Sequence, residues 1–137
     1  MAERALLDTG FVVALVNAAD PDHDRCVAVW KELRAGILSV EGVIVESAHM
    51  LRRVRNGAAT AVRLIHDAGT RLVPMTLERS ERALALMVKY QDVPMDWVDA
   101  CLVVLAEEER VADVLTLDRR GFSAYRIRGR QRFHVRP

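Results

Sequence analysis

The sequence has little cysteine and no long hydrophobic run, and each shortage excludes a class of protein. The two cysteines, Cys26 and Cys101, form no CxxC pair and no zinc-type spacing, so we expect reduced thiols used for packing. No apolar run reaches the roughly 18 residues of a membrane-spanning helix. Glu3 interrupts the N-terminal region, which lacks a signal-peptide layout. We therefore expect a cytoplasmic protein with a single globular domain over residues 1–137 and no membrane partner.

Acidic residues are missing from the C-terminal end. Residues 119–137 hold seven arginines and no Asp or Glu, although the net charge of the whole chain is only +1. A basic end of this kind can contact phosphates. However, 18 of the 20 basic residues are arginines and alanine is abundant, as in proteins from GC-rich genomes. The basic end alone therefore leaves both interpretations open.

Short apolar runs alternate with helical patterns along the chain. Strands are expected at residues 4–8, 37–40, 70–75 and 112–118, with a last edge strand at 133–135. Helices are expected at residues 10–18, 20–36, 42–54, 58–69, 76–91 and 95–110. Because strands that alternate with helices typically form parallel sheets, the pattern favours an α/β protein.

Two aspartates stand at the ends of predicted strands. Asp8 follows the apolar run ALL, and Asp118 follows VLTL. An ionised carboxylate in such surroundings costs several kcal/mol unless a cation or hydrogen bonds compensate it. A single Asp at a strand end is often only a helix cap. Ligands bind parallel sheets at the edge where the strands end, so two aspartates at that edge indicate a ligand-binding site.

Three further acids lie in or beside apolar helical segments. Asp96 and Asp99 share a face in the first turn of a predicted helix that is apolar all round, and Asp96 has an alternative role as its N-cap. Glu46 is the single acid in VIVESAHML, where a side chain pointing outward is the alternative. Carboxylates without nitrogen or thiolate ligands suit Mg²⁺ or Mn²⁺. We therefore expect a cation site of this type.

Four segments together resemble the PIN-domain family, and specifically ribonuclease toxins of the VapC type. They are LLDTGFVVALVNAADPDHDRC, VIVESAHML, VPMDWVDACLVVLAEE and VLTLDRRGFSAYR, in that order. The family pattern of Asp, Glu, Asp and Asp falls on Asp8, Glu46, Asp99 and Asp118. Asp96 matches an additional acid one helical turn before Asp99. No acid of the pattern is lost.

The resemblance implies a three-layer α/β/α sandwich with a central, mostly parallel sheet of four to five strands. It also implies a Mg²⁺- or Mn²⁺-dependent endoribonuclease, the toxin of a type II toxin–antitoxin system. Such an enzyme cleaves RNA phosphodiesters with metal-activated water. The implied partners are an RNA substrate, a cognate antitoxin protein and a second copy of the chain in a homodimer.

Each candidate residue has an expected role in this hypothesis. The catalytic acids would be Asp8, Glu46, Asp99 and Asp118, and the metal ligands would be these four together with Asp96. Thr9 and Thr116 are candidate hydroxyls that orient carboxylates or contact phosphate. For Thr116 the preference of threonine for strands is an alternative explanation, and the stronger one on sequence alone. Arg119 and Arg120 are candidate phosphate contacts near the site.

Three other interpretations follow from the same residues. The Asp-Thr-Gly at residues 8–10 is also the aspartic-protease signature, but such proteases are all-β and this chain is helix-rich with one copy. A Mg²⁺-dependent phosphotransfer domain would use an Asp nucleophile and a Lys after a strand, and neither Lys31 nor Lys89 follows one. A PIN-like module that binds RNA or a partner without cleavage stays open, because a complete set of acids does not establish activity.

Overall fold

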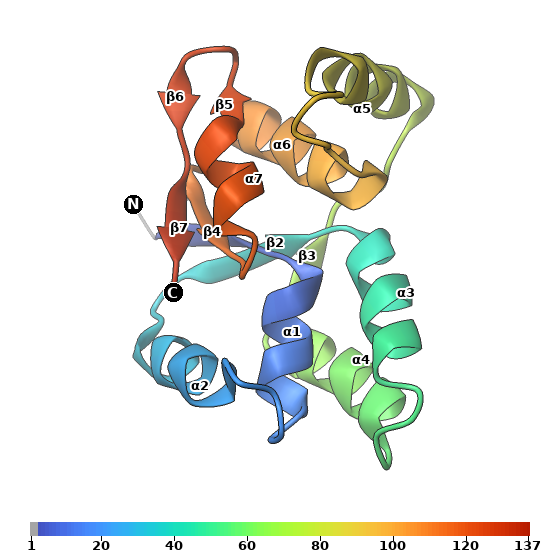
Figure 1. Ribbon diagram of the computed structural model, residues 1–137, viewed down its shortest axis with the longest axis vertical. Helices are drawn as coiled ribbons and strands as arrows, with labels where there is room; N and C mark the ends of the chain where they lie inside the picture. Colours follow the sequence, from blue (N-terminus) through green and yellow to red (C-terminus); the bar gives the residue numbers. More distant parts are fainter. Residues whose placement is uncertain (1–2) are drawn as a thin grey trace.

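The computed structural model describes residues 3–137, and a five-stranded parallel sheet runs through its centre (Figure 1). The strands are β1 (Arg4–Leu7), β2 (Gly36–Ser39), β3 (Arg71–Leu72), β4 (Asp113–Leu115) and β7 (His134–Arg136). Their order is β3-β2-β1-β4-β7, and all neighbouring pairs are parallel. The prediction of a parallel sheet of four to five strands is confirmed.

Helices cover both faces of the sheet and complete the three layers (Figure 1). One face carries α1 (Thr9–Val16), α2 (His23–Glu32), α3 (Glu41–Met50) and α4 (Gly57–Asp67). The other face carries α5 (Leu77–Lys89), α6 (Trp97–Glu109) and α7 (Arg119–Ala124). An antiparallel hairpin of β5 (Arg126–Ile127) and β6 (Gln131–Arg132) follows α7. Within the described range, no helix combines the length and apolar character needed to cross a membrane.

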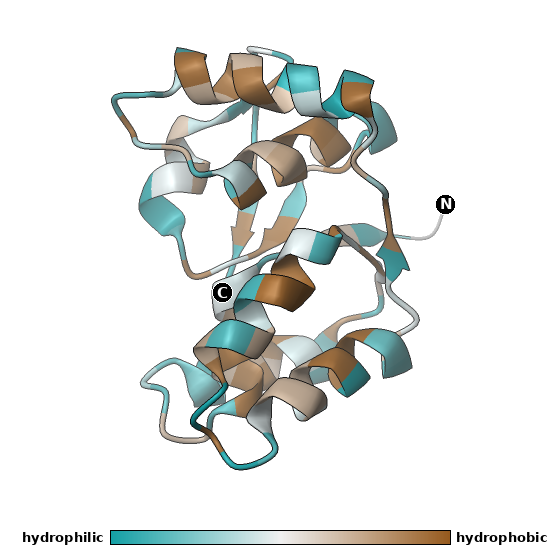
Figure 2. Cartoon of the chain, turned by 90° about the vertical axis from the view of Figure 1, so that its right-hand side faces the viewer, coloured by the Kyte–Doolittle hydropathy of each residue, from teal (hydrophilic) through white to brown (hydrophobic). Residues whose placement is uncertain are grey.

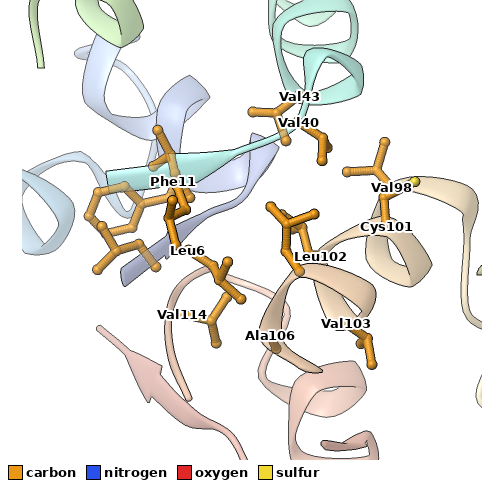
Figure 3. Packing of buried hydrophobic residues seen from close by; sticks show 14 of the residues in the cluster. Leu6, Phe11, Val40, Val43, Val98, Cys101, Leu102, Val103, Ala106 and Val114 are labelled. Carbon is orange, nitrogen blue, oxygen red and sulfur yellow. The ribbon is translucent and has the colours of Figure 1, made fainter. Parts of the chain in front are cut away.

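The core forms where α6 packs on the sheet. Every residue from Val98 to Ala106 is buried, as expected for a helix that is apolar on all sides. Figure 3 shows Leu102 of α6 in the same packed region as Leu6 of β1 and Val114 of β4. Each fully buried side chain of this size contributes about 1.5–3 kcal/mol. This packing fixes the first turn of α6, which carries Asp96 as its cap, against the carboxyl edge of the sheet.

The outer helix α5 shields α6 from solvent. Ala83 and Leu86 of α5 are buried, whereas Leu84 and Val88 are exposed. Figure 2 accordingly shows hydrophobic and hydrophilic residues mixed along this helix at the top of the molecule. Its N-cap is Thr76, whose hydroxyl accepts a hydrogen bond from the backbone nitrogen of Arg79. This cap lies at the first residue of the helix expected at residues 76–91.

The chain after β4 differs from the sequence prediction. The expected strand 112–118 ends at Leu115, and Asp118 instead caps the short helix α7. The turn forms because the Thr116 hydroxyl accepts a hydrogen bond from the backbone nitrogen of Asp118 at 3.0 Å. The sequence also did not predict α7 or the β5–β6 hairpin, since six helical residues and paired two-residue strands are too short for a periodic pattern. The edge strand expected at 133–135 lies one residue later.

Candidate active site

Asp8 stands directly after β1 and is held by two hydrogen bonds. Its Oδ1 accepts from the backbone nitrogen of Thr9 at 2.8 Å, and its Oδ2 accepts from the hydroxyl of Thr116 at 2.7 Å. The side chain is buried, with 7% exposed. The pKa of Asp8 is raised to about 6. Burial is the main cause and the charges of Asp96 and Glu46 add to it, while both hydrogen bonds oppose the rise.

Asp96 and Asp99 form a reciprocal cap at the start of α6. Asp96 Oδ1 accepts from the Asp99 backbone nitrogen at 2.8 Å, and Asp99 Oδ2 accepts from the Asp96 backbone nitrogen at 3.3 Å. Asp99 is buried, with 8% exposed. Burial first, and then the charges of Asp96, Asp8 and Asp118, raise the pKa of Asp99 to about 8. Asp96 is thus the N-cap of α6, and its charge also raises the pKa values of Asp8 and Asp99.

Glu46 comes from the middle of α3 and is half-buried. The hydroxyl of Thr9 donates to its Oε1 at 2.6 Å. Because Thr9 follows Asp8 directly, this hydrogen bond brings α3 to the end of β1. The alternative that Glu46 points outward is wrong.

Asp118 lies at the exposed rim of the same edge, at the N-terminus of α7. Its Oδ1 accepts from the backbone nitrogen of Gly121 at 3.0 Å. The hydroxyl of Thr116 connects it to Asp8, because that hydroxyl donates to Asp8 and accepts from the Asp118 backbone nitrogen. The hydrogen bond from Thr116 to Asp8 is consistent with the orienting role predicted for Thr116.

The two predicted arginines differ in their surroundings. Both follow Asp118 on the first turn of α7 and are exposed. The guanidinium of Arg119 donates to the carbonyl oxygen of Pro137. Arg120 makes no hydrogen bond or ion pair within residues 3–137. Of the two, Arg120 is the better placed to meet a phosphate.

The site gathers negative charge without a compensating cation. The charges of Asp96 and Glu46 raise the pKa of Asp8, and those of Asp96, Asp8 and Asp118 raise the pKa of Asp99. None of these five acids forms an ion pair in the part of the chain that the structure describes. Carboxylate oxygens of this kind fit a hard divalent cation. Within residues 3–137, no group of three or more His, Cys, Asp or Glu side chains already lies in a metal-binding arrangement.

Sequence reasoning missed two residues that touch these acids. Tyr125 donates its hydroxyl hydrogen to Asp99, and Gly121 leaves room for the Asp118 carboxylate. Gly121 follows Asp118 by three residues and Tyr125 follows it by seven, which is helical spacing. That spacing is a usable signal only once α7 is known to exist.

The sheet order, the two helical layers and the acids at the carboxyl edge define the class of protein, a PIN domain. The family model described as PIN domain matches residues 5–127, and the chain belongs to the PIN-domain family. The residues that first suggested this family are thus part of a match that covers most of the chain.

One relative in sequence and two solved structures are similar to this chain over most of its length. Ribonuclease VapC26 of Mycobacterium tuberculosis is 33% identical over 135 residues, which is 96% of this chain and 99% of that protein. The crystal structure of VapC20 from Mycobacterium tuberculosis, a toxin that cleaves the sarcin–ricin loop, matches with a TM-score of 0.80 and 20% identity over 97% of this chain and 99% of that chain. A toxin–antitoxin complex from Klebsiella pneumoniae matches with a TM-score of 0.62 and 18% identity over 88% and 91% of the two chains.

Proposed function

We propose that this PIN-domain protein is a divalent-metal-dependent endoribonuclease of the toxin class. The observation that carries the proposal is the set of carboxylates at the sheet edge, two of them buried and none paired with a basic residue of the described chain. The relative named a ribonuclease, at 33% identity over almost the whole of both chains, supports RNA as the substrate.

The proposed cofactor is Mg²⁺ or Mn²⁺. The ligands would be Asp8, Asp99 and Asp118, with Glu46 and Asp96 completing the shell. A hard cation fits this donor set because its charge offsets both the burial, which is the main cause of the raised pKa values of Asp8 and Asp99, and the repulsion from the other acids. When bound, it would supply a water of lowered pKa and a positive charge beside the phosphate under attack, whose oxygens it would polarise.

The residues of the chain supply position and access. The hydroxyls of Thr9 and Thr116 hold Glu46 and Asp8 in place. Asp8 is buried and Asp118 is exposed to solvent. The RNA backbone would therefore approach the site from the rim at the start of α7. Arg120, in that first turn, would neutralise an RNA phosphate.

We also propose an antitoxin protein as partner, a second copy of the chain as homodimer partner, and a cytoplasmic location. The likeness to a toxin–antitoxin complex supports the antitoxin, together with membership of the family. An antitoxin that keeps a nuclease of this kind inactive in its own cell must reach either the acids or the rim that admits RNA.

The phosphotransfer alternative loses support from the position of the lysines. Lys31 lies in α2, and Lys89 closes α5 with its Nζ 5.3 Å from the ring centre of Tyr90. Neither follows a strand of the sheet, where a phosphate-binding lysine would be needed. The non-catalytic binding module keeps the same acids, and only an activity measurement separates it from the nuclease.

The experiment is cleavage of a labelled RNA pool by protein freed of antitoxin through unfolding and refolding. We expect cleavage with Mg²⁺ or Mn²⁺, none with EDTA, and a loss of at least about 100-fold in Asp99→Asn. Asp24→Asn, an exposed acid of α2, is the matched control and should keep full activity. If the wild-type protein binds Mn²⁺ but cleaves no RNA, the nuclease hypothesis is wrong and the non-catalytic binding module takes its place.

A further inference from the structure

Tyr125 is a fully buried tyrosine whose hydroxyl reaches the candidate active site. It ends α7, and its side chain is 0% exposed. The hydroxyl donates to Oδ2 of Asp99 on α6, at 3.2 Å. A contact between residues 26 apart in sequence thus connects the two helices that carry Asp99 and Asp118.

The same hydroxyl also lies close to the Asp118 side chain. A Cβ atom at position 121 would lie 2.4 Å from Oδ2 of Asp118 and 3.0 Å from the Tyr125 hydroxyl. Because residue 121 is glycine, the space between the two groups is left to them. The phenol oxygen therefore stands beside one candidate ligand and is hydrogen-bonded to another.

Aromatic neighbours fix the direction of the Tyr125 ring. Tyr90 and Phe122 each pack edge-to-face on it with ring centres 5.2 Å away, and Phe133 continues the cluster from Phe122. A ring held on two sides cannot turn its hydroxyl away from Asp99. The hydroxyl of Tyr90, in contrast, accepts from the backbone nitrogen of Arg126 and touches no acid of the site.

The hydrogen bonds to Asp99 are all on one oxygen. Oδ2 accepts from Tyr125 and from the backbone nitrogen of Asp96, whereas Oδ1 accepts no hydrogen bond from residues 3–137. Two donors on Oδ2 fix the plane of the carboxylate and leave Oδ1 open. The carboxylate is thus pre-oriented before any ligand arrives.

We infer that Tyr125 is a positioning residue that holds the Asp99 carboxylate with one oxygen available to a divalent cation. The inference rests on the proposed function, since it assigns a role toward the cation of that same site. Hydrogen-bond partners of metal ligands typically contribute 10- to 100-fold to metal affinity or activity. A merely structural tyrosine would instead contribute to the packing of the cluster alone.

The experiment compares Tyr125→Phe with Tyr90→Phe, because each removes one hydroxyl from the same aromatic cluster and keeps the ring. Mn²⁺ affinity is measured by calorimetric titration, melting is measured in EDTA, and cleavage is measured against RNA concentration. We expect Tyr125→Phe to bind Mn²⁺ about tenfold more weakly and to lower kcat with KM for RNA unchanged. Tyr90→Phe should bind Mn²⁺ as the wild type does, whatever its melting temperature.

Three results would overturn the inference. If Tyr125→Phe binds Mn²⁺ as tightly as wild type, the hydroxyl does not position a ligand, and the proposed function still stands. If both variants weaken Mn²⁺ binding equally, the effect belongs to the aromatic cluster and the assignment to Asp99 is wrong. If wild-type protein neither binds Mn²⁺ nor cleaves RNA, the proposed function fails together with the inference.

Discussion

Asp99 is a buried carboxyl group surrounded by other acids, so its packing opposes its ionisation. The apolar helix that carries it is buried along its whole middle section, and three other acids face it. Burial and those charges raise its pKa to about 8. In the absence of a cation, much of the folded protein therefore keeps this group protonated at neutral pH, and ionising it costs stability.

Asp99→Asn should therefore stabilise the metal-free protein at about pH 8.5, by about 1–3 kcal/mol. The amide removes the buried charge and still offers an oxygen to Tyr125 and to the cap. At about pH 5 the folded wild-type group is neutral and only its ionisation in the unfolded state opposes folding, so the variant should gain clearly less than at about pH 8.5. Urea unfolding in EDTA at both pH values measures this. Lower stability of the variant at both values would mean that Asp99 carries no such conflict.

Gly121→Ala should destabilise the protein even though alanine is the better helix former. Propensity alone predicts a gain of up to about 1 kcal/mol, but the new Cβ would lie 2.4 Å from Asp118 Oδ2. We expect a loss of about 1 kcal/mol in unfolding free energy and roughly tenfold slower cleavage, because the carboxylate must move. Gly10→Ala is the control for stability, since its Cβ would meet only Leu117, at 3.7 Å. Equal melting of wild type and Gly121→Ala would contradict the clash.

At the scale of elements, the turn after β4 assembles the site. Thr116 is fully buried, and its backbone nitrogen donates to the carbonyl oxygen of Arg136 in β7. Its hydroxyl meets Asp8 after β1 and the backbone of Asp118 before α7. One residue thus fixes the relative position of three strands and a helix, and the separation of two of the proposed ligands.

Thr116→Val should cost about 1–3 kcal/mol at neutral pH, because it keeps the shape of threonine but leaves the buried Asp8 oxygen without its donor. Thr116→Ser keeps the hydroxyl and should restore most of the lost stability and Mn²⁺ affinity. Thermal melting and Mn²⁺ titration of the two variants test this. Equal losses in both would show that the methyl group, and not the hydroxyl, is what the site needs.

The elements also show what sequence can predict. The first strand, the buried helix α6 and the acids at Asp8 and Asp99 were predicted because each is marked by a local pattern, an apolar run with a charge at its end. The contact of Tyr125 with Asp99 was not predicted, since no local pattern links residues 26 apart in sequence. An orienting role was predicted for Thr116, but its partner Asp8, 108 residues away, was not. Asp118 was likewise predicted from its place after an apolar run, whereas the role of Glu46 depended more on the resemblance, because one acid in an apolar helical segment is a weaker local signal.

For the whole molecule, charge is separated more than the net value of +1 suggests. Five acids converge at the carboxyl edge of the sheet, while the last 19 residues contain no acid. The ion pairs that do form among the described residues, such as that of Arg4 with Glu109, lie outside the converging acids. The site is therefore left with a charge that only protons or an added cation can balance.

Protons and the proposed cation should compete for this charge, which fixes the pH dependence of stability. Asp8 and Asp99 have pKa values of about 6 and about 8 in the folded protein, both raised above the unfolded values. The folded state then holds more protons than the unfolded state, so metal-free stability should fall as pH rises from about 5 to about 8.5, by an amount on the order of a few kcal/mol. Glu109, whose pKa is lowered by Arg4, titrates below this window and does not reverse the sign.

Saturating Mg²⁺ should flatten or reverse this slope, because cation binding keeps the carboxylates ionised in the folded state. At 100 times its dissociation constant, a ligand adds about 2.7 kcal/mol, and the added stability should be larger at about pH 8.5 than at about pH 5, where protons occupy the ligands. Urea unfolding at the two pH values, with Mg²⁺ and with EDTA, gives the four numbers needed. Stability in EDTA that rises with pH would show that the acids at the sheet edge are compensated by the protein itself, and that the charge of the site needs no cation.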